Sequence, residues 1–203
     1  MLVPVSISTN IFTTFLVKTP TTLSASFSAV QSKSASPKWQ QSIQTASAEA
    51  VTVKGSNGQY TGQVSIDAPI TTVWSVLTDY DNFEQFFPNI SESKLIQSQD
   101  NKKVFEQQYQ IRIAGFSRQF RVQVEAQETY PKAIKFQQVE GDLKTLEGEW
   151  EIQTLPSNSR SVVVTHRVTV MPVDTFTRGI FFSIYENTFK KTLFALKQEA
   201  EQR

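Results

Sequence analysis

The apolar positions near the end of the chain follow the period of one long helix. Between Thr175 and Arg203, apolar side chains recur at steps of three and four residues. They are Phe182, Tyr185, Phe189, Leu193, Leu196 and Ala200. Charged residues such as Glu186 and Lys190 occupy the opposite face. The pattern predicts an amphipathic C-terminal helix whose apolar stripe packs against the rest of the domain.

Upstream of this helix the apolar period changes to two, which is typical of strands with one wet face. Strand-like segments cover 51–53, 60–66, 91–97, 104–113, 118–126, 134–136, 144–152 and 161–170. In the last of these, His166 shares one face with four valines. Short turns between such segments favour an antiparallel sheet.

Two short helices interrupt the strand pattern. Ile70, Val73, Trp74 and Leu77 have helical spacing after Pro69, a residue suited to the first helical position. A second helix is expected over 82–87, capped by Asp79 or Asp81. These elements together predict an α+β domain in which a curved antiparallel sheet of about seven strands surrounds a long C-terminal helix.

Residues 1–48 differ in composition from the remainder and are treated as an appendage to a domain at 49–203. They contain 17 Ser or Thr residues, three lysines and no acidic residue. Such composition fits a disordered tail or a mis-assigned start codon, and it also resembles a targeting peptide, although arginine is absent. A cytoplasmic or membrane-peripheral location is expected, with N-terminal targeting as the alternative.

Charge and cysteine content exclude several functions. The part from residue 49 onward carries a formal charge of −2, which disfavours nucleic acid as a partner. The absence of cysteine excludes disulfides, thiolate nucleophiles and cysteine-based metal sites. A single histidine excludes a multi-histidine metal cluster, and no cofactor is implied.

Three segments resemble a known family. The stretch from Ala68-Pro69 to Asn82-Phe83, continuing to Phe87-Pro88-Asn89-Ile90, is similar to the opening of START-like domains. Gly141-Asp142-Leu143 through Leu146-Glu147-Gly148-Glu149-Trp150 and Leu193-Phe194-Ala195-Leu196-Lys197 are similar to later parts of the same family. The closest branch is that of polyketide cyclase/dehydrase and coenzyme Q-binding proteins, and the similarity covers roughly 55–200.

The resemblance implies a helix-grip fold with an apolar cavity between the sheet and the C-terminal helix. Family members bind or shuttle lipids, isoprenoid quinones and polyketides, and some bacterial relatives are described as ribosome-associated. The resemblance names no ligand, because one fold hosts several functions.

Inward-facing aromatic and polar residues are the candidates for a ligand site. They are Tyr109, Phe120, Phe136, Trp150, His166, Phe182, Tyr185 and Phe189, with Phe86 and Phe87 as candidates for an entrance. The alternative is that the aromatic residues simply fill the core. The segment 83–87 is either a buried hinge or an apolar lid that touches a membrane.

His166 is the sharpest candidate for chemistry. Its ring could hydrogen-bond a quinone or ketone oxygen, act as a general acid, or be a structural histidine satisfied by a neighbour. Asp79 and Asp81 are interpreted as helix caps rather than a catalytic pair. The alternating glutamates at 147, 149 and 151 are interpreted as a solvated stripe rather than a metal site.

The sequence therefore favours a non-catalytic protein that binds a hydrophobic small molecule, an isoprenoid quinone or another lipid, with transient membrane contact. A cyclase or dehydrase that uses His166 is the first alternative. A protein-interaction module, for example a ribosome-associated factor, is the second. Ligand identity and oligomeric state stay open.

Overall fold

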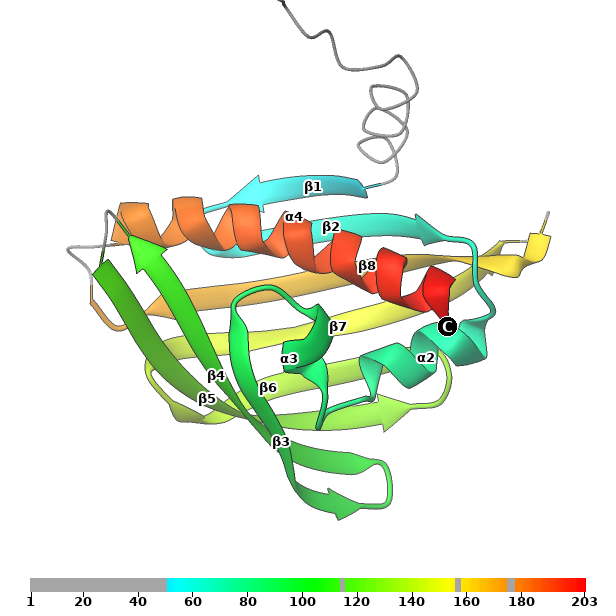
Figure 1. The fold of residues 1–203 in the computed structure, drawn as a ribbon, viewed down its shortest axis with the longest axis horizontal. Helices are drawn as coiled ribbons and strands as arrows, with labels where there is room; N and C mark the ends of the chain where they lie inside the picture. The colour runs from blue at the N-terminus through cyan, green and yellow to red at the C-terminus, as the bar shows by residue number, and fades with distance from the viewer. Residues whose placement is uncertain (1–50, 114–115, 156–157, 175–177) are drawn as a thin grey trace, which may run out of the picture. The chain divides into compact units, whose positions relative to one another are not determined.

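The computed structural model describes residues 51–203 except 114–115, 156–157 and 175–177, so the predictions for 1–48 lie outside the described residues. Eight antiparallel strands form one sheet in the described part of the chain, in the order β1-β2-β8-β7-β6-β5-β4-β3 (Figure 1). The strands are β1 (Val51–Ser56), β2 (Gln59–Ile66), β3 (Ile90–Gln99), β4 (Lys102–Ile113), β5 (Phe116–Thr129), β6 (Ala133–Gly141), β7 (Leu143–Leu155) and β8 (Asn158–Pro172).

The hairpin of β1 and β2 lies next to β8, the last strand of the domain, in the sheet. Strands β3 to β8 form a continuous meander, and β2 pairs with β8, so that the first hairpin extends the sheet beyond its last strand. The predicted sheet of about seven strands is confirmed, with eight observed among the described residues. Register shifts in β3, between Ile90 and Glu92 and between Leu95 and Gln97, mark bulges of the kind that bend a strand.

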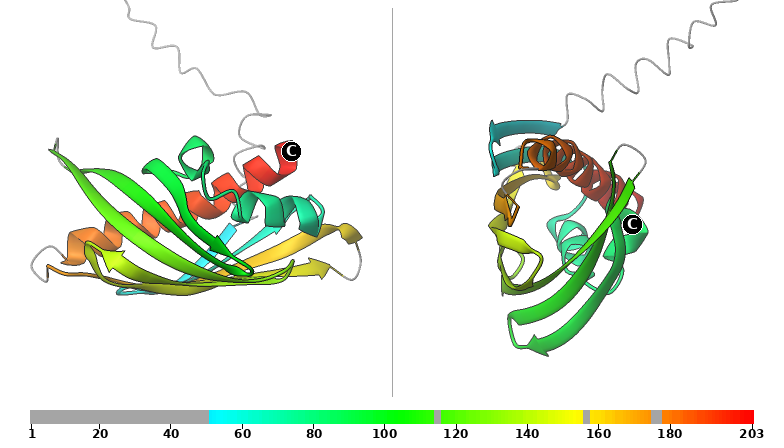
Figure 2. Two further views of the ribbon diagram at one scale, coloured as in Figure 1. Left: turned by 90° about the horizontal axis from the view of Figure 1, so that it is seen from below. Right: turned by 90° about the vertical axis from the view of Figure 1, so that its left-hand side faces the viewer.

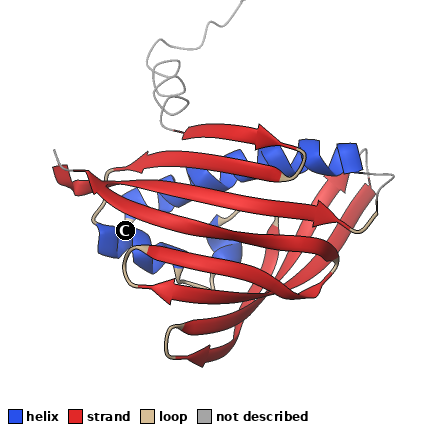
Figure 3. Ribbon diagram, turned by 180° about the vertical axis from the view of Figure 1, so that it is seen from behind, coloured by secondary structure: helices blue, strands red, loops and turns tan. Residues whose placement is uncertain are grey.

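All helices of the described chain lie on one face of the sheet. The sheet curves around α4 (Arg178–Gln202), and α2 (Ile70–Leu77) and α3 (Phe83–Phe86) lie on the same concave side (Figure 2). Seen from behind, the strands lie in front of the helices (Figure 3). The predicted curved sheet around a C-terminal helix is thus confirmed. Among the described residues, no helix has the length and apolarity that spanning a bilayer requires.

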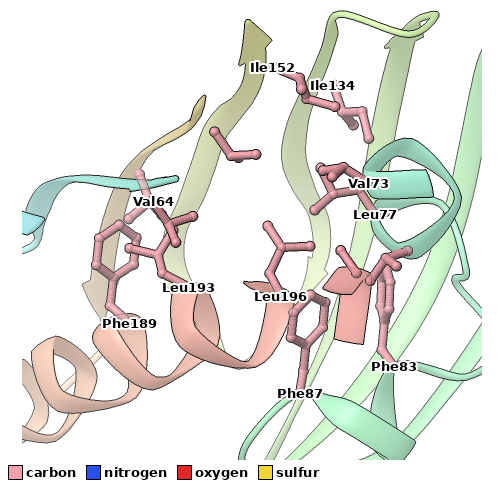
Figure 4. Close-up of a cluster of buried hydrophobic side chains, with 14 of the residues drawn as sticks. Val64, Val73, Leu77, Phe83, Phe87, Ile134, Ile152, Phe189, Leu193 and Leu196 are labelled. Carbon is pink, nitrogen blue, oxygen red and sulfur yellow. The ribbon is translucent and has the colours of Figure 1, made fainter. Parts of the chain in front are cut away.

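The apolar stripe of α4 is buried most completely from Phe189 to the end of the helix. Phe189, Leu193, Leu196 and Ala200 are at most 3% exposed. Gly62 of β2 makes this close packing possible, because a Cβ atom built there would lie 2.3 Å from Leu193 Cδ1 and 2.8 Å from Phe189 Cε1. Side chains from α4, α2, α3 and the strands converge into one buried apolar cluster (Figure 4).

The second helix is shorter than expected, and the predicted caps are wrong. Helix α3 follows Asn82, whose side chain makes no capping hydrogen bond. The Asp81 carboxylate instead accepts a hydrogen bond from the backbone N–H of Leu95 at 2.8 Å, which fixes the segment to β3. Asp79 accepts hydrogen bonds from Asn82 and Arg203. Both carboxylates therefore make tertiary or loop contacts, which local sequence cannot reveal.

Truncating the α4 stripe should destabilise the domain. Leu193 is fully buried, so Leu193→Ala is expected to lower the free energy of unfolding by about 2–5 kcal/mol, through lost burial and the cavity that remains. Lys190→Ala, at an exposed position of the same helix, is the control and should change it by less than about 0.5 kcal/mol. Urea denaturation of both variants measures the difference, and equal effects would contradict the assigned packing.

Candidate ligand-binding site

A cavity of about 130 Å³ lies between the first half of α4 and the concave face of the sheet. Strands β3 to β8 supply most of its walls, and the segment from Leu77 to Ile90 supplies another. The lining residues are Leu77, Tyr80, Phe83, Phe87, Pro88, Ile90, Phe105, Gln107, Tyr109, Val124, Ala126, Ile134, Phe136, Leu146, Trp150, His166, Tyr185, Thr188, Phe189 and Thr192. None of them is an Asp, Glu, Lys or Arg, so the cavity is apolar with a few neutral polar groups.

A second hollow of about 50 Å³ adjoins the first toward the start of α4. The two share four lining residues, namely Tyr109, Leu146, Tyr185 and Thr188. Phe120 lies in the wall of the smaller hollow, where its ring stacks on Tyr109 with the centroids 4.9 Å apart. The two hollows are therefore neighbours beneath α4, separated by these shared side chains.

Most of the residues predicted for a ligand site lie together. Those in the wall of the larger cavity are Phe87, Tyr109, Phe136, Trp150, His166, Tyr185 and Phe189. Phe86 and Phe182 line neither hollow. The Phe86 ring packs against Phe83 and beneath the Arg203 guanidinium, 5.6 Å from the ring centroid. Phe182 packs beside Phe181 and over Gly58.

The phenylalanines at 83, 86 and 87 pack together, with Phe83 and Phe87 buried and Phe86 partly exposed. Phe83 and Phe87 are 5% and 8% exposed, and Phe83 also contacts Phe105 of β4. Of the two predicted alternatives, a buried hinge or an apolar lid facing a membrane, the structure supports the buried one. Phe87 faces the cavity, not the solvent.

His166 stands between two aromatic side chains. On β8 it pairs with Trp150 of β7 on one side and with Gly62 of β2 on the other. Trp150 stacks on the imidazole at 3.5 Å between ring centroids with a 3° interplanar angle. Phe189 occupies the space above Gly62 and lies 5.0 Å from the imidazole centroid. The glycine on β2 thus leaves room for the ring that covers the second side of His166.

Burial controls the protonation of His166. The side chain is 5% exposed, and desolvation lowers its pKa to about 3, against the opposing effect of a hydrogen bond to the Glu149 carbonyl. The imidazole is therefore neutral near pH 7. A neutral ring with this pKa has little capacity as a general acid or base under physiological conditions.

Other polar groups of the cavity lie on β4 and α4. The Tyr109 hydroxyl donates a hydrogen bond to Gln107 Oε1 at 2.8 Å, and burial raises the pKa of Tyr109. Burial also raises the pKa of Tyr185, with a further contribution from nearby Tyr109. Both phenols stay protonated at neutral pH, so the site is uncharged throughout.

Sequence reasoning missed Gln107, Tyr80 and the α4 threonines 188 and 192. Gln107 is 7% exposed and lies between Phe105 and Tyr109 on the inner face of β4. Strict alternation along β4 would have placed it inward, since 105, 107 and 109 share a face. Because glutamine is polar, it is readily assigned to the solvent-facing side of a strand, and its inward position on β4 is then overlooked.

Several hydrogen bonds hold the wall 79–90 against the sheet and α4. Asn89 Nδ2 donates to Thr188 Oγ1 at 2.8 Å, and Arg203, which directly follows α4, pairs with Asp79 at 2.7 Å. The buried Ser93 hydroxyl donates to the Tyr80 carbonyl at 2.6 Å. The wall on this side of the cavity is therefore held by hydrogen bonds to both the sheet and α4.

Comparison with known proteins identifies the relatives of this chain. The sequence profile of the family described as "Polyketide cyclase / dehydrase and lipid transport" matches residues 66–194. No curated protein matches the sequence.

Similar solved structures share the fold. They include the Zhui aromatase/cyclase from Streptomyces sp. R1128 (TM-score 0.59, 20% identity, 71% of this chain and 94% of that chain). A STAR-related lipid transfer protein from Xanthomonas axonopodis also has TM-score 0.59 and 20% identity, covering 76% and 95%. A START superfamily protein from Mycobacterium smegmatis has TM-score 0.60 and 16% identity, covering 71% and 97%. At these identities the likeness shows the fold alone.

The buried histidine should make stability depend on pH. An unfolded histidine has a pKa near 6.5, and the folded pKa is about 3, so the unfolded chain binds more protons between these values. The free energy of unfolding should therefore fall as the pH drops below 6.5, with a slope approaching about 1.4 kcal/mol per pH unit. Urea denaturation at several pH values between 7 and 5 measures this slope. Most carboxylates titrate below this range and therefore contribute little to it.

His166→Phe provides the control for this slope. His166 is the only histidine of the chain, so the variant should be nearly independent of pH over the same range. An unchanged slope in the variant would show that other groups cause it.

Proposed function

Since the chain belongs to the polyketide cyclase/dehydrase and lipid transport family, we propose that its domain binds a hydrophobic small molecule, an isoprenoid quinone or another lipid, whose polar head lies in the cavity. The observation that carries this proposal is the uncharged cavity under α4, with aromatic walls and a few polar groups. Apolar walls with a few placed polar groups are typical of small-molecule sites.

The cavity volume limits how much of a ligand can be enclosed. Small-molecule pockets commonly measure about 300–1,000 Å³, whereas a cavity of about 150 Å³ holds a single benzene ring. About 130 Å³ therefore accommodates a ring-sized head group. A long apolar tail would pass into the adjoining hollow or require the wall 79–90 to move away from α4.

The absence of a charged group from the cavity wall favours binding over catalysis. A cyclase or dehydrase requires a group that exchanges a proton near neutral pH. His166 has a pKa of about 3, and the tyrosines have raised pKa values. The lining residues are better suited to desolvating and hydrogen-bonding a ligand than to acid–base chemistry.

Filling the cavity should abolish uptake of a lipid. The full-length protein is incubated with phospholipid vesicles that contain an isoprenoid quinone together with its quinol, re-isolated, and assayed for both forms by ultraviolet absorbance. Ala126 is fully buried in the cavity wall, so Ala126→Leu should reduce the total of bound quinone and quinol at least about tenfold. Gln127→Leu adds the same side chain at the neighbouring exposed position and should bind as the wild type does. Equal binding by both variants, or none by the wild type, would contradict the proposal.

Loosening the wall should speed exchange of the ligand. Thr188→Val removes the acceptor of the Asn89 hydrogen bond while keeping the side-chain shape. The loss of one hydrogen bond is worth about 0.5–1.5 kcal/mol, so release should accelerate by roughly twofold to tenfold. Stopped-flow measurement of Trp fluorescence during transfer to acceptor vesicles records the rate.

Thr192→Val is the matched control for this experiment. Thr192 also lines the cavity, one turn further along α4, but its hydroxyl bonds to the Thr188 carbonyl of its own helix at 3.0 Å. Its exchange rate should stay close to that of the wild type. Equal acceleration in both variants would point to cavity polarity rather than to the wall.

A further inference from the structure

The backbone partner of His166 decides what its ring offers to a ligand. Imidazole Nδ1 lies 3.1 Å from the carbonyl oxygen of Glu149. A backbone carbonyl oxygen only accepts hydrogen bonds, so Nδ1 carries the proton and donates it. A neutral imidazole has one such proton, which leaves Nε2 as a hydrogen-bond acceptor without a hydrogen of its own.

The surroundings of the ring do not supply a second proton. The aromatic neighbours Trp150, Phe136 and Phe189 carry no charge, and the cavity wall includes no carboxylate that would stabilise an imidazolium. Desolvation lowers the pKa of His166 to about 3, which agrees with this arrangement. At neutral pH the ring keeps a single proton, and this proton is committed to Glu149.

His166 lines the cavity, and its ring lies between Trp150 of β7 and Phe189 of α4. Because the Glu149 carbonyl holds Nδ1, Nε2 is the ring nitrogen that is left for a ligand. Among the described residues no hydrogen bond to Nε2 is present. Among the described residues, the buried polar side-chain atoms that lack a hydrogen-bond partner are Glu84 Oε2, Gln138 Oε1 and Arg178 Nε. Because Nε2 is not one of them and makes no such bond, it is not fully enclosed by protein atoms, and His166 lines the cavity.

We infer that the ligand of this domain presents a hydrogen-bond donor, a hydroxyl group, to His166 Nε2. The inference rests on the proposed function and narrows it to the hydroxyl-bearing members of the hydrophobic classes: quinols, phenols and lipid alcohols. A quinone or ketone oxygen would place one acceptor against another and leave both unsatisfied in a dry site. Under this inference His166 bonds a donor group of the ligand, rather than the quinone or ketone oxygen considered in the sequence analysis.

Other groups of the cavity wall, on β4 and α4, offer hydrogen-bond donors instead of an acceptor. Gln107 Oε1 is occupied by the Tyr109 hydroxyl, so Gln107 Nε2 remains as a donor without a partner in the described chain. The Tyr185 hydroxyl also has no hydrogen-bond partner among the described residues. A carbonyl or ether oxygen elsewhere on the ligand is compatible with these groups. The discriminating position is His166 alone.

The tautomer can be measured directly, because the chain has one histidine. In the full-length protein labelled with ¹⁵N-histidine, two-bond ¹H–¹⁵N correlation spectra at pH 7 should show a protonated, pyrrole-type Nδ1 and an unprotonated, pyridine-type Nε2. Cyclohexanol, a ring-sized alcohol, should shift Nε2 toward the protonated range on binding. Cyclohexanone, which has the same number of heavy atoms, should leave Nε2 unshifted. A pyrrole-type Nε2 in the free protein would overturn the inference.

A thermodynamic cycle isolates the contribution of His166. The dissociation constants of cyclohexanol and cyclohexanone are compared in the wild type, in His166→Phe and in His166→Gln by NMR titration. The preference for the alcohol should be about tenfold larger in the wild type than in His166→Phe. In His166→Gln the amide can either donate or accept, so the preference should also fall toward that of His166→Phe.

The outcomes separate this inference from the proposed function. Binding of both compounds with the same ratio in all three proteins would leave the cavity as a binding site and overturn the assignment of His166. Binding of neither compound to the wild type would contradict the proposed function itself. Urea denaturation of each variant verifies that it is folded before its affinities are compared.

Discussion

The packing of the α4 stripe on the concave face of the sheet is the contact on which the domain depends. In the second half of the helix, Leu193 and Leu196 pack in one cluster with apolar residues of α2 and the strands, and both are fully buried. In the first half, Tyr185 and Phe189 face wide aromatic rings and polar side chains that cannot interlock as closely. One helix therefore both holds the fold together and covers a cavity. The second half of α4 contributes mainly to stability, and the first half contributes mainly to the binding cavity.

The surroundings of His166 follow from this packing. Gly62 has no side chain, so α4 can approach β2 and bring Phe189 against the imidazole, while the strand register brings Trp150 to the other side. The resulting dry environment keeps the ring neutral, and the Glu149 carbonyl orients it. A histidine held in this way is a fixed acceptor rather than a proton carrier. The chemistry of the site is thus decided by backbone register as much as by side-chain identity.

Much of the fold could be predicted from the period of apolar residues, because the apolar stripe of α4 and the alternating apolar residues of strands such as β2 turn toward the core. The inward position of His166 followed from the valines around it. The caps assigned to Asp79 and Asp81 were wrong, because their partners Arg203 and Leu95 are distant in sequence. Gln107 was missed because a polar residue at an inward position looks like an interruption of the pattern. The cavity volume could not be predicted, since it is a small difference between large side-chain volumes from many elements.

The central claim is that this domain holds a hydrophobic molecule beneath α4, and the most direct measurement is to identify what it carries. The full-length protein is purified from cells without detergent, and an organic extract is analysed by mass spectrometry. The account predicts a near-stoichiometric hydrophobic compound that bears a hydroxyl group. An extract that stays empty after the protein has been incubated with membranes would contradict the claim.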